Sequence, residues 1–199
     1  EGMTLCAHVV HARVGILYLR QEYAYLRPHL ETVLARRRAA GLLGRGILGS
    51  ALDFDVSIQL GAGAYIAGME TAMIKSLEGR RAIPRRRWPL PVHQGYLREP
   101  TVVNNVETFA AATAISAHGA AWFTQSGTPQ STGTKLFCVS GDVERPGIYE
   151  YPWGIKVREV LRDAGGLDAQ AAQIGGPSGT LIGAGELDRA LCFEDLASV

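Results

Sequence analysis

The chain has 199 residues, of which 47% are hydrophobic and 20% charged, and its formal net charge is +1. This composition predicts a globular protein of one ordinary domain or two small ones, and it gives no reason to expect a nucleic acid or an acidic surface as a general partner. The apolar runs are shorter than the ~18 residues that a membrane-spanning helix needs, and no signal peptide is recognisable. We therefore expect a cytoplasmic protein with no membrane span of its own.

The first half of the chain alternates between strand and helix patterns. Residues 15–20 form a short apolar run typical of a strand, and a helical pattern follows with Pro28 in its first turns. Residues 54–60 then alternate apolar and polar side chains, as a half-buried strand does. A helix is predicted next at 69–78. An ordered loop rich in Pro and Arg follows at 83–100, and a second helix at 105–118. This order predicts an α/β layer structure.

The second half begins with a stretch rich in Gly, Ser and Thr at residues 126–134, which indicates a linker. Two strands and a helix follow, and then more strand-like sequence, as expected for a small β-grasp domain. The predicted elements lie at 135–140, 148–151 and 157–164. The sequence therefore predicts an α/β domain at 1–125, the linker at 126–134 and a β-grasp domain at 135–199.

The cysteines are few and scattered, at Cys6, Cys138 and Cys192. They include no C-x-x-C pair, so neither a zinc site nor an iron–sulfur cluster can be built from this stretch alone, and we predict no metal site in it. Free thiols of this kind indicate a reducing compartment. We expect Cys138, which lies in an apolar run, to be in the core.

A glycine-rich turn follows the strand predicted at 54–60. Its glycines, Gly61, Gly63 and Gly68, would let the backbone approach a flat or anionic group, and the next helix would offer N–H donors at its N-terminus. The spacing alone is weak evidence, since it matches neither G-x-G-x-x-G nor the P-loop. A tight turn that needs small residues explains it at least as well.

The turn belongs to a longer series of ordered motifs. They are Gly61-Ala62-Gly63-Ala64-Tyr65-Ile66-x-Gly68-x-Glu70-Thr71-Ala72, Ser76-Leu77-Glu78-Gly79-Arg80-Arg81, Pro84-Arg85, and Pro100-Thr101-Val102-Val103-Asn104-Asn105-Val106-Glu107-Thr108. Read together, these motifs resemble the flavoprotein subunit family, which comprises the NADH-oxidising subunit of respiratory complex I and the diaphorase subunits of NAD-reducing hydrogenases and NAD-dependent formate dehydrogenases. The resemblance runs from Glu1 to Val199, and segments such as Gln94-Gly95-Tyr96-Leu97 are closest to the hydrogenase branch.

The resemblance implies a Rossmann-like FMN-binding α/β domain followed by a β-grasp (ubiquitin-like, soluble-ligand-binding) domain. It implies non-covalent FMN with NADH stacked over it, a hydride passing to the flavin, and single electrons leaving to iron–sulfur clusters. A thioredoxin-like 2Fe-2S subunit and other subunits of an electron-transfer complex are the implied partners. The protein is expected in the cytoplasm, and the alternative is peripheral attachment to the inner face of a membrane through such a complex. The family's upstream glycine-rich loop and its downstream cysteine cluster, which binds a 4Fe-4S centre, are expected in parts of the protein outside this sequence.

The resemblance assigns cofactor contacts residue by residue and assigns no catalytic residue, because the chemistry takes place on FMN. The contacts are Gly61, Gly63, Tyr65 and Gly68 along the flavin, Val103, Asn104, Asn105 and Thr108 at its polar edge, and Glu70 and Arg87 toward the nicotinamide nucleotide. Other readings stay open. Tyr65 would also serve as a core aromatic, the two asparagines as turn or N-cap residues of the following helix, and Glu70 as a charge that favours a helix N-terminus.

Among the positions that depart from the family pattern, three bear on the nucleotide. Met69 stands where the family has an acidic residue, Arg87 where it has Lys, and Leu90 where it has a Phe against which adenine packs. Losing that ring would cost about 1–3 kcal/mol of base stacking, and Trp88 offers a substitute surface. These changes affect the nucleotide more than the flavin. A non-catalytic flavin-binding or assembly paralogue is therefore the alternative to an NADH:acceptor oxidoreductase (diaphorase).

A third alternative is nucleic-acid binding through the basic run from Arg80 to Arg87. A surface of that kind usually interleaves aromatic side chains with the basic ones, and Trp88 is the one aromatic residue at this run. We expect no nucleic-acid partner.

Overall fold

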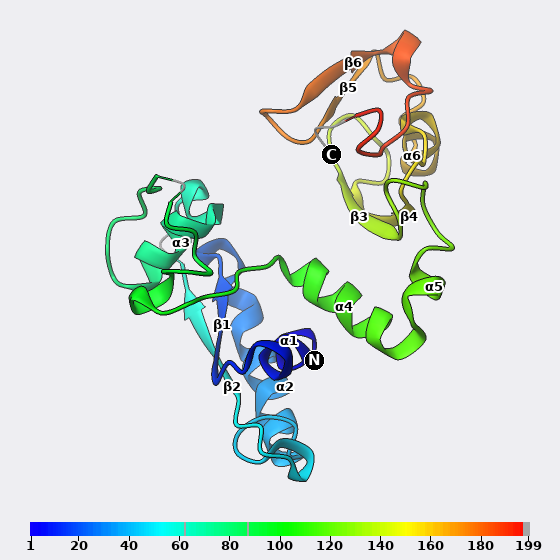
Figure 1. Cartoon of the computed structure of the whole chain (residues 1–199). Helices are drawn as coiled ribbons and strands as arrows, with labels where there is room; N and C mark the ends of the chain where they lie inside the picture. The colour runs from blue at the N-terminus through cyan, green and yellow to red at the C-terminus, as the bar shows by residue number, and fades with distance from the viewer. Residues whose placement is uncertain (62, 87, 197–199) are drawn as a thin grey trace. The chain divides into compact units, whose positions relative to one another are not determined.

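The computed structural model describes residues 1–61, 63–86 and 88–196. The chain divides into two compact units, Glu1–Thr113 and Ala114–Val199, and each is described here by itself (Figure 1). The domain limits expected from the sequence, with a linker at 126–134, stay a prediction.

The helices are α1 (Gly2–Val10), α2 (Arg27–Ala39), α3 (Glu70–Leu77), α4 (Val106–His118), α5 (Ala120–Phe123) and α6 (Val157–Ala164). The strands are β1 (Val14–Leu19), β2 (Asp55–Leu60), β3 (Thr134–Val139), β4 (Gly147–Pro152), β5 (Ala171–Ile174) and β6 (Thr180–Gly183). Short 3-10 helices are η1 (Gln21–Leu26), η2 (Ile47–Gly49), η3 (Tyr65–Gly68), η4 (Tyr96–Arg98) and η5 (Ala184–Glu186).

The first unit is built on two parallel strands. β1 pairs with β2 from Val14 opposite Asp55 to Leu19 opposite Leu60, and α2 connects them in the chain. Val56 is buried and its neighbour Asp55 exposed, because successive side chains of a strand point to opposite faces. This is the strand–helix–strand order predicted from the sequence. Because the strands are parallel, their carboxyl ends meet at one edge of the sheet.

An arginine ties α2 to this strand pair. Nε of Arg38 donates to both carboxylate oxygens of Asp55, at 2.9 and 3.0 Å, and the guanidinium also donates to the Val56 carbonyl at 2.7 Å. The hydrogen bond from Arg38 holds the pKa of Asp55 below its usual value. One cluster of buried apolar side chains in this unit consists of Ala7, Leu43, Ile47, Phe54 and Val56.

Helix α1 was not predicted from the sequence. It has no side-chain N-cap, since Glu1 makes no capping hydrogen bond, and the usual start signal is therefore missing. The helix is held by close packing on α4. A Cβ atom on Gly2 would lie 2.0 Å from the carbonyl oxygen of Phe109, so only glycine allows this approach.

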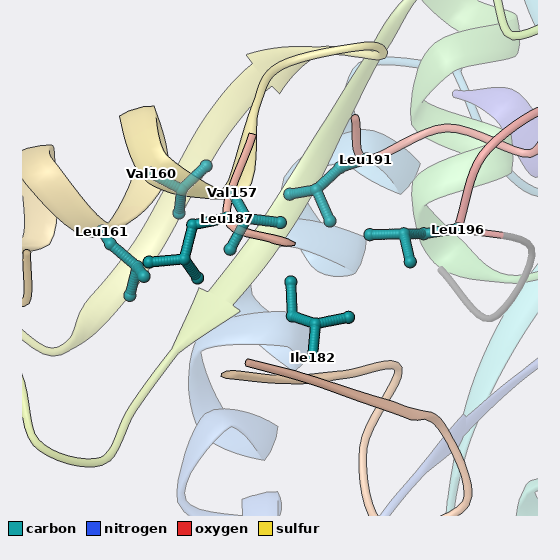
Figure 2. Close-up of a cluster of buried hydrophobic side chains, with 7 residues drawn as sticks. All are labelled: Val157, Val160, Leu161, Ile182, Leu187, Leu191 and Leu196. Atoms are coloured by element: carbon teal, nitrogen blue, oxygen red, sulfur yellow. The ribbon is translucent and has the colours of Figure 1, made fainter. Parts of the chain in front are cut away.

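The second unit combines two antiparallel hairpins, β3–β4 and β5–β6, with α6. Helix α6 begins where the Glu159 carboxylate accepts a hydrogen bond from the backbone N–H of Lys156 at 3.1 Å, and it ends at Gly165, whose φ of 75° forms a left-handed C-cap. Figure 2 shows the apolar side chains that make its core: Val157, Val160, Leu161, Ile182, Leu187, Leu191 and Leu196.

The segment predicted as a linker is folded onto this second unit. The hydroxyls of Thr128 and Ser131 both donate to the carboxylate of Glu194, and the Phe193 N–H donates to Ser131 Oγ at 3.1 Å. Ser131 is only 3% exposed. The two hydroxyl hydrogen bonds lower the pKa of Glu194 to about 2. We call Thr128, Ser131 and Glu194 the hydroxyl clasp.

The prediction that Cys138 lies in the core is wrong. Along β3 the side chains of Phe137 and Val139 pack against the core, so Cys138 between them points outward and is exposed, whereas Cys192 is the buried thiol. Within the described ranges, no cluster of His, Cys, Asp or Glu side chains could hold a metal ion. No helix in that part of the chain is long and apolar enough to cross a bilayer.

Candidate cofactor-binding site

The predicted site residues begin at the carboxyl edge of the parallel strands. The backbone N–H of Gly61, the first residue after β2, donates to the carbonyl of Leu19, the last residue of β1, at 2.8 Å. The segments that leave the two strands therefore start side by side. Ligands of open α/β sheets bind outside the carboxyl ends of the strands, so this edge is where a cofactor site is expected.

The three predicted glycines have different structural reasons. A Cβ on Gly61 would lie 2.7 Å from the hydroxyl oxygen of Tyr18, so packing on that ring requires glycine. Gly63 has a φ of +73°, a backbone conformation that side chains other than glycine rarely adopt. Gly68 has neither constraint, because nothing lies within 4 Å of the Cβ position and its φ is not positive. The backbone at Gly68 is thus open to the close approach of a flat ligand, which fits a flavin.

Tyr65 is the most exposed large side chain of the turn, at 84%. The alternative reading, that it is a core aromatic, is therefore wrong for the described structure. Ala67 is the residue of η3 that is buried, and it anchors the turn instead. Glu70 is exposed at the first position of α3, and Met69 is the N-cap residue without a side-chain hydrogen bond.

The asparagine pair lies directly ahead of α4. Oδ1 of Asn105 accepts a hydrogen bond from the backbone N–H of Glu107 at 2.9 Å, so this side chain does cap the helix, as the alternative reading held. The cap uses the amide oxygen and leaves the –NH₂ donors of Asn105 for other partners. Asn104 and Thr108 are exposed, and Val103 is half-buried.

The structure brings together the residues within each of these two segments. Both segments belong to the first unit. Among the described residues, no hydrogen bond, ion pair or ring contact joins Tyr65–Glu70 to Val103–Asn105. Two pockets of about 240 and 210 Å³ in the first unit are lined by other residues, between α1 and α4 and between α2 and β2. The binding of one ligand by both segments therefore stays a prediction.

The loop between α3 and α4 is anchored at both ends of α3, which agrees with the prediction of an ordered loop. The Arg85 N–H donates to Thr71 Oγ1 at 3.2 Å, and the Leu97 N–H donates to Glu78 Oε1 at 3.0 Å. Trp88 is 67% exposed, and its ring lies nearly parallel to that of His93, with centroids 6.3 Å apart. Arg87, predicted to contact the nucleotide, lies outside the described residues.

The sequence analysis missed a cluster of charged and aromatic side chains at the carboxyl edge of the parallel strands. Arg20 follows β1 and donates from Nη2 to the Glu22 carboxylate at 3.1 Å, and its guanidinium carbon lies 5.5 Å from the centre of the Tyr23 ring. The hydrogen bond with Glu22 raises the pKa of Arg20, and Tyr23 and Tyr65 add to this effect. The sequence signal was a charged and aromatic run directly after a strand. That signal gains meaning only once β1 is known to lie beside β2.

A strand–helix–strand unit with a glycine turn and exposed aromatic rings at its carboxyl edge defines an α/β cofactor-binding protein. The Nuo51 FMN-binding domain family matches residues 1–114, and the SLBB domain family matches residues 136–182. The chain belongs to the Nuo51 FMN-binding domain family. These matches confirm the predicted fold class, an FMN-binding α/β part followed by a soluble-ligand-binding part.

Individual relatives agree with this assignment. The chain is 53% identical over 198 residues to the NAD-reducing hydrogenase HoxS subunit alpha of Cupriavidus necator, covering 98% of this chain and 33% of that protein. It is 42% identical over 203 residues to the NADP-reducing hydrogenase subunit HndC of Solidesulfovibrio fructosivorans, covering 100% of this chain and 41% of that protein. The crystal structure of an NAD⁺-reducing [NiFe]-hydrogenase in its H₂-reduced state superposes with a TM-score of 0.90 at 50% identity, covering 98% of this chain and 33% of the other. The chain thus spans 33% to 41% of the length of these three proteins.

Proposed function

We propose that this chain is the flavin-binding part of an NADH:acceptor oxidoreductase of the diaphorase type. The observation that carries the proposal is the open backbone at Gly68 beside the exposed ring of Tyr65, at the carboxyl edge of a parallel strand pair. A protein gains nothing in stability from an exposed ring beside an unfilled glycine, whereas a flat cofactor would cover both. Two relatives that are named as subunits of NAD-reducing and NADP-reducing hydrogenases support the same conclusion.

Different residues of the candidate site would contact different parts of FMN. Tyr65 and Gly68 would offer an aromatic face and a bare backbone to the flavin ring. Asn104 and the free –NH₂ group of Asn105, with the backbone of Val103, would donate to and accept from the polar edge of that ring. When bound, FMN supplies the redox chemistry, taking a hydride from the nicotinamide and releasing electrons singly.

The nucleotide side of the site is proposed on fewer observations. Glu70 is exposed at the start of α3, where it can contact the nicotinamide nucleotide, and Arg87 would supply a positive charge to the nucleotide phosphates. The relatives divide between the two nucleotides, since one is named NAD-reducing and another NADP-reducing.

The relatives are named as subunits, so this chain is proposed to act within a larger cytoplasmic complex. In that complex, electrons would pass from FMN to a 4Fe-4S cluster outside the present sequence and to a thioredoxin-like 2Fe-2S subunit. Attachment to the inner face of a membrane, where it occurs, would be through other subunits.

A second candidate is a flavin-binding paralogue that no longer oxidises the nucleotide. Its support is Met69, which is 54% exposed at the N-cap of α3 where the family has an acidic residue, together with Leu90 in place of an aromatic ring. Titrating the FMN-loaded full-length protein with NADH under anaerobic conditions separates the two. Loss of the flavin absorbance supports the oxidoreductase, whereas bound flavin that stays oxidised with both NADH and NADPH supports the paralogue.

A further inference from the structure

Arg20 lies at the edge of the sheet where the flavin is proposed to bind. Arg20 follows Leu19, the last residue of β1, and the carbonyl of Leu19 accepts the hydrogen bond from Gly61. The glycine turn therefore starts next to Arg20, although Gly61, its first residue, is 41 positions further along the chain. Only the parallel pairing of β1 with β2 creates this neighbourhood.

Arg20 is held at this edge by two neighbours from η1. The carboxylate of Glu22 accepts one of the five N–H donors that a guanidinium carries, at 3.1 Å. The ring of Tyr23 lies beneath the guanidinium at 5.5 Å, within the range of a cation–π contact. The hydrogen bond with Glu22 raises the pKa of Arg20, and Tyr23 and Tyr65 add smaller contributions in the same direction.

Folding does not explain this arrangement. The side chains of Arg20 and Glu22 are 50% and 47% exposed, and an exposed ion pair contributes little to stability. Tyr23 is 45% exposed and Tyr65 is 84% exposed. Arg38 provides the contrast, because its bonds to Asp55 and Val56 join a helix to a strand. In the described part of the chain, the side-chain hydrogen bond and the ring contact of Arg20 reach only Glu22 and Tyr23, which belong to its own short turn.

We propose that Arg20 places a positive charge beside the bound flavin and so raises its midpoint potential, and that Glu22 limits this effect. The inference rests on the proposed function, since it needs a flavin at this edge. A flavin ring takes up negative charge when it is reduced, so a nearby cation stabilises the reduced form more than the oxidised form. A flavin lying over the edge would also displace water, and charges interact more strongly where water is excluded.

The test is the midpoint potential of FMN in the full-length protein, measured by redox titration, for the variants Arg20→Gln, Arg20→Lys and Glu22→Gln. In Arg20→Gln, binding of reduced FMN should weaken about tenfold relative to oxidised FMN, which lowers the potential by about 30 mV for a two-electron couple. Glu22→Gln removes the compensating negative charge and should shift the potential the opposite way. Arg20→Lys keeps the positive charge, although not the guanidinium geometry. The midpoint potential of this variant should therefore change by no more than about a third of the change in Arg20→Gln.

Arg158→Gln is the matched control. Arg158 donates to Asp188 at 3.1 Å with side chains 45% and 63% exposed, so it resembles the Arg20 pair, but it lies outside residues 1–114, which match the FMN-binding domain family. Opposite shifts for Arg20→Gln and Glu22→Gln, with no shift for Arg158→Gln, support the inference. The inference is overturned if the potentials of Arg20→Gln and Glu22→Gln are unchanged, or if both shift in the same direction. It is also overturned if Arg158→Gln shifts as much as Arg20→Gln does. If Arg20→Gln fails to fold, an unchanged potential in Glu22→Gln still overturns it. A wild-type protein that binds no flavin would instead contradict the proposed function.

Discussion

The hydroxyl oxygen of Tyr18 on β1 lies 3.0 Å from the hydroxyl oxygen of Ser76 on α3, in a part-buried position. The same tyrosine ring lies against Gly61, where a Cβ would be 2.7 Å from its hydroxyl oxygen. Tyr18 therefore fixes both the start of the glycine turn and the helix that follows the turn. The position of Gly68 and Glu70 between these two contacts depends on it.

Removing the Tyr18 hydroxyl should loosen this connection. We expect Tyr18→Phe to lower the free energy of unfolding by about 1 kcal/mol, since a typical intramolecular hydrogen bond contributes that much. Denaturant unfolding of the full chain, with Ser76→Ala and the double variant, measures the coupling. Single variants whose losses simply add would show that the two hydroxyls do not interact.

The glycines of the turn should separate into two kinds. Gly61→Ala should destabilise the protein by about 1–3 kcal/mol, because the added methyl group would overlap the Tyr18 ring. Gly68→Ala should change stability by no more than about 0.5 kcal/mol, because its Cβ position is open, and yet weaken FMN binding. Thermal unfolding and a flavin fluorescence titration of the full-length protein measure the two effects. Full FMN affinity in Gly68→Ala would remove the main argument for a flavin at this turn.

The two neighbouring asparagines should also differ. Asn105 caps α4, so Asn105→Ala should cost about 1 kcal/mol of stability. Asn104 is exposed one residue earlier, so Asn104→Ala should leave stability unchanged and weaken FMN binding. Asn105→Asp is the control, because aspartate also caps helices and should restore the stability that Asn105→Ala loses. A loss of stability in Asn104→Ala but not in Asn105→Ala would contradict the assignment of the helix cap to Asn105.

The hydroxyl clasp predicts an acid-sensitive second unit. The pKa of Glu194 in the folded protein is about 2, below the ordinary value of 4.5 that applies to the unfolded chain. Because the folded pKa is the lower one, the clasp stabilises fully above pH 4.5, and this contribution is lost as the pH falls toward 2. Unfolding followed from pH 6 to pH 2 should therefore show a steeper loss in the wild type than in Glu194→Gln. Parallel curves for the two proteins would show that the clasp does not carry this pH dependence.

Local patterns predicted much of the fold. The alternation in β2, Pro28 at the start of α2 and the bounds of α6 at 157–164 are all found where the sequence indicated them. Helix α1 was missed because its stability comes from packing of Gly2 on α4, which no local signal reveals. Cys138 was placed in the right strand but on the wrong face, since composition does not give the phase of an alternation.

In the candidate site too, the sequence did not reveal features that depend on contacts between distant segments. The motif around Gly61 and the asparagine pair are contiguous in sequence, so a resemblance can identify them. It cannot separate a glycine required by Tyr18 from one that leaves room for a ligand, because that difference depends on a neighbour from another strand. Arg20 was missed for the same reason, since its place beside Gly61 comes from strand pairing.

The central claim is that a flavin lies at the carboxyl edge of β1 and β2, over Gly68 and Tyr65. The most direct measurement is the flavin content of the full-length protein as purified, followed by titration of any apoprotein with FMN. The account predicts a yellow protein with one FMN per chain, whose Tyr65→Ala and Gly68→Ala variants retain less. A protein that is colourless as purified and stays so when supplied with FMN would contradict it.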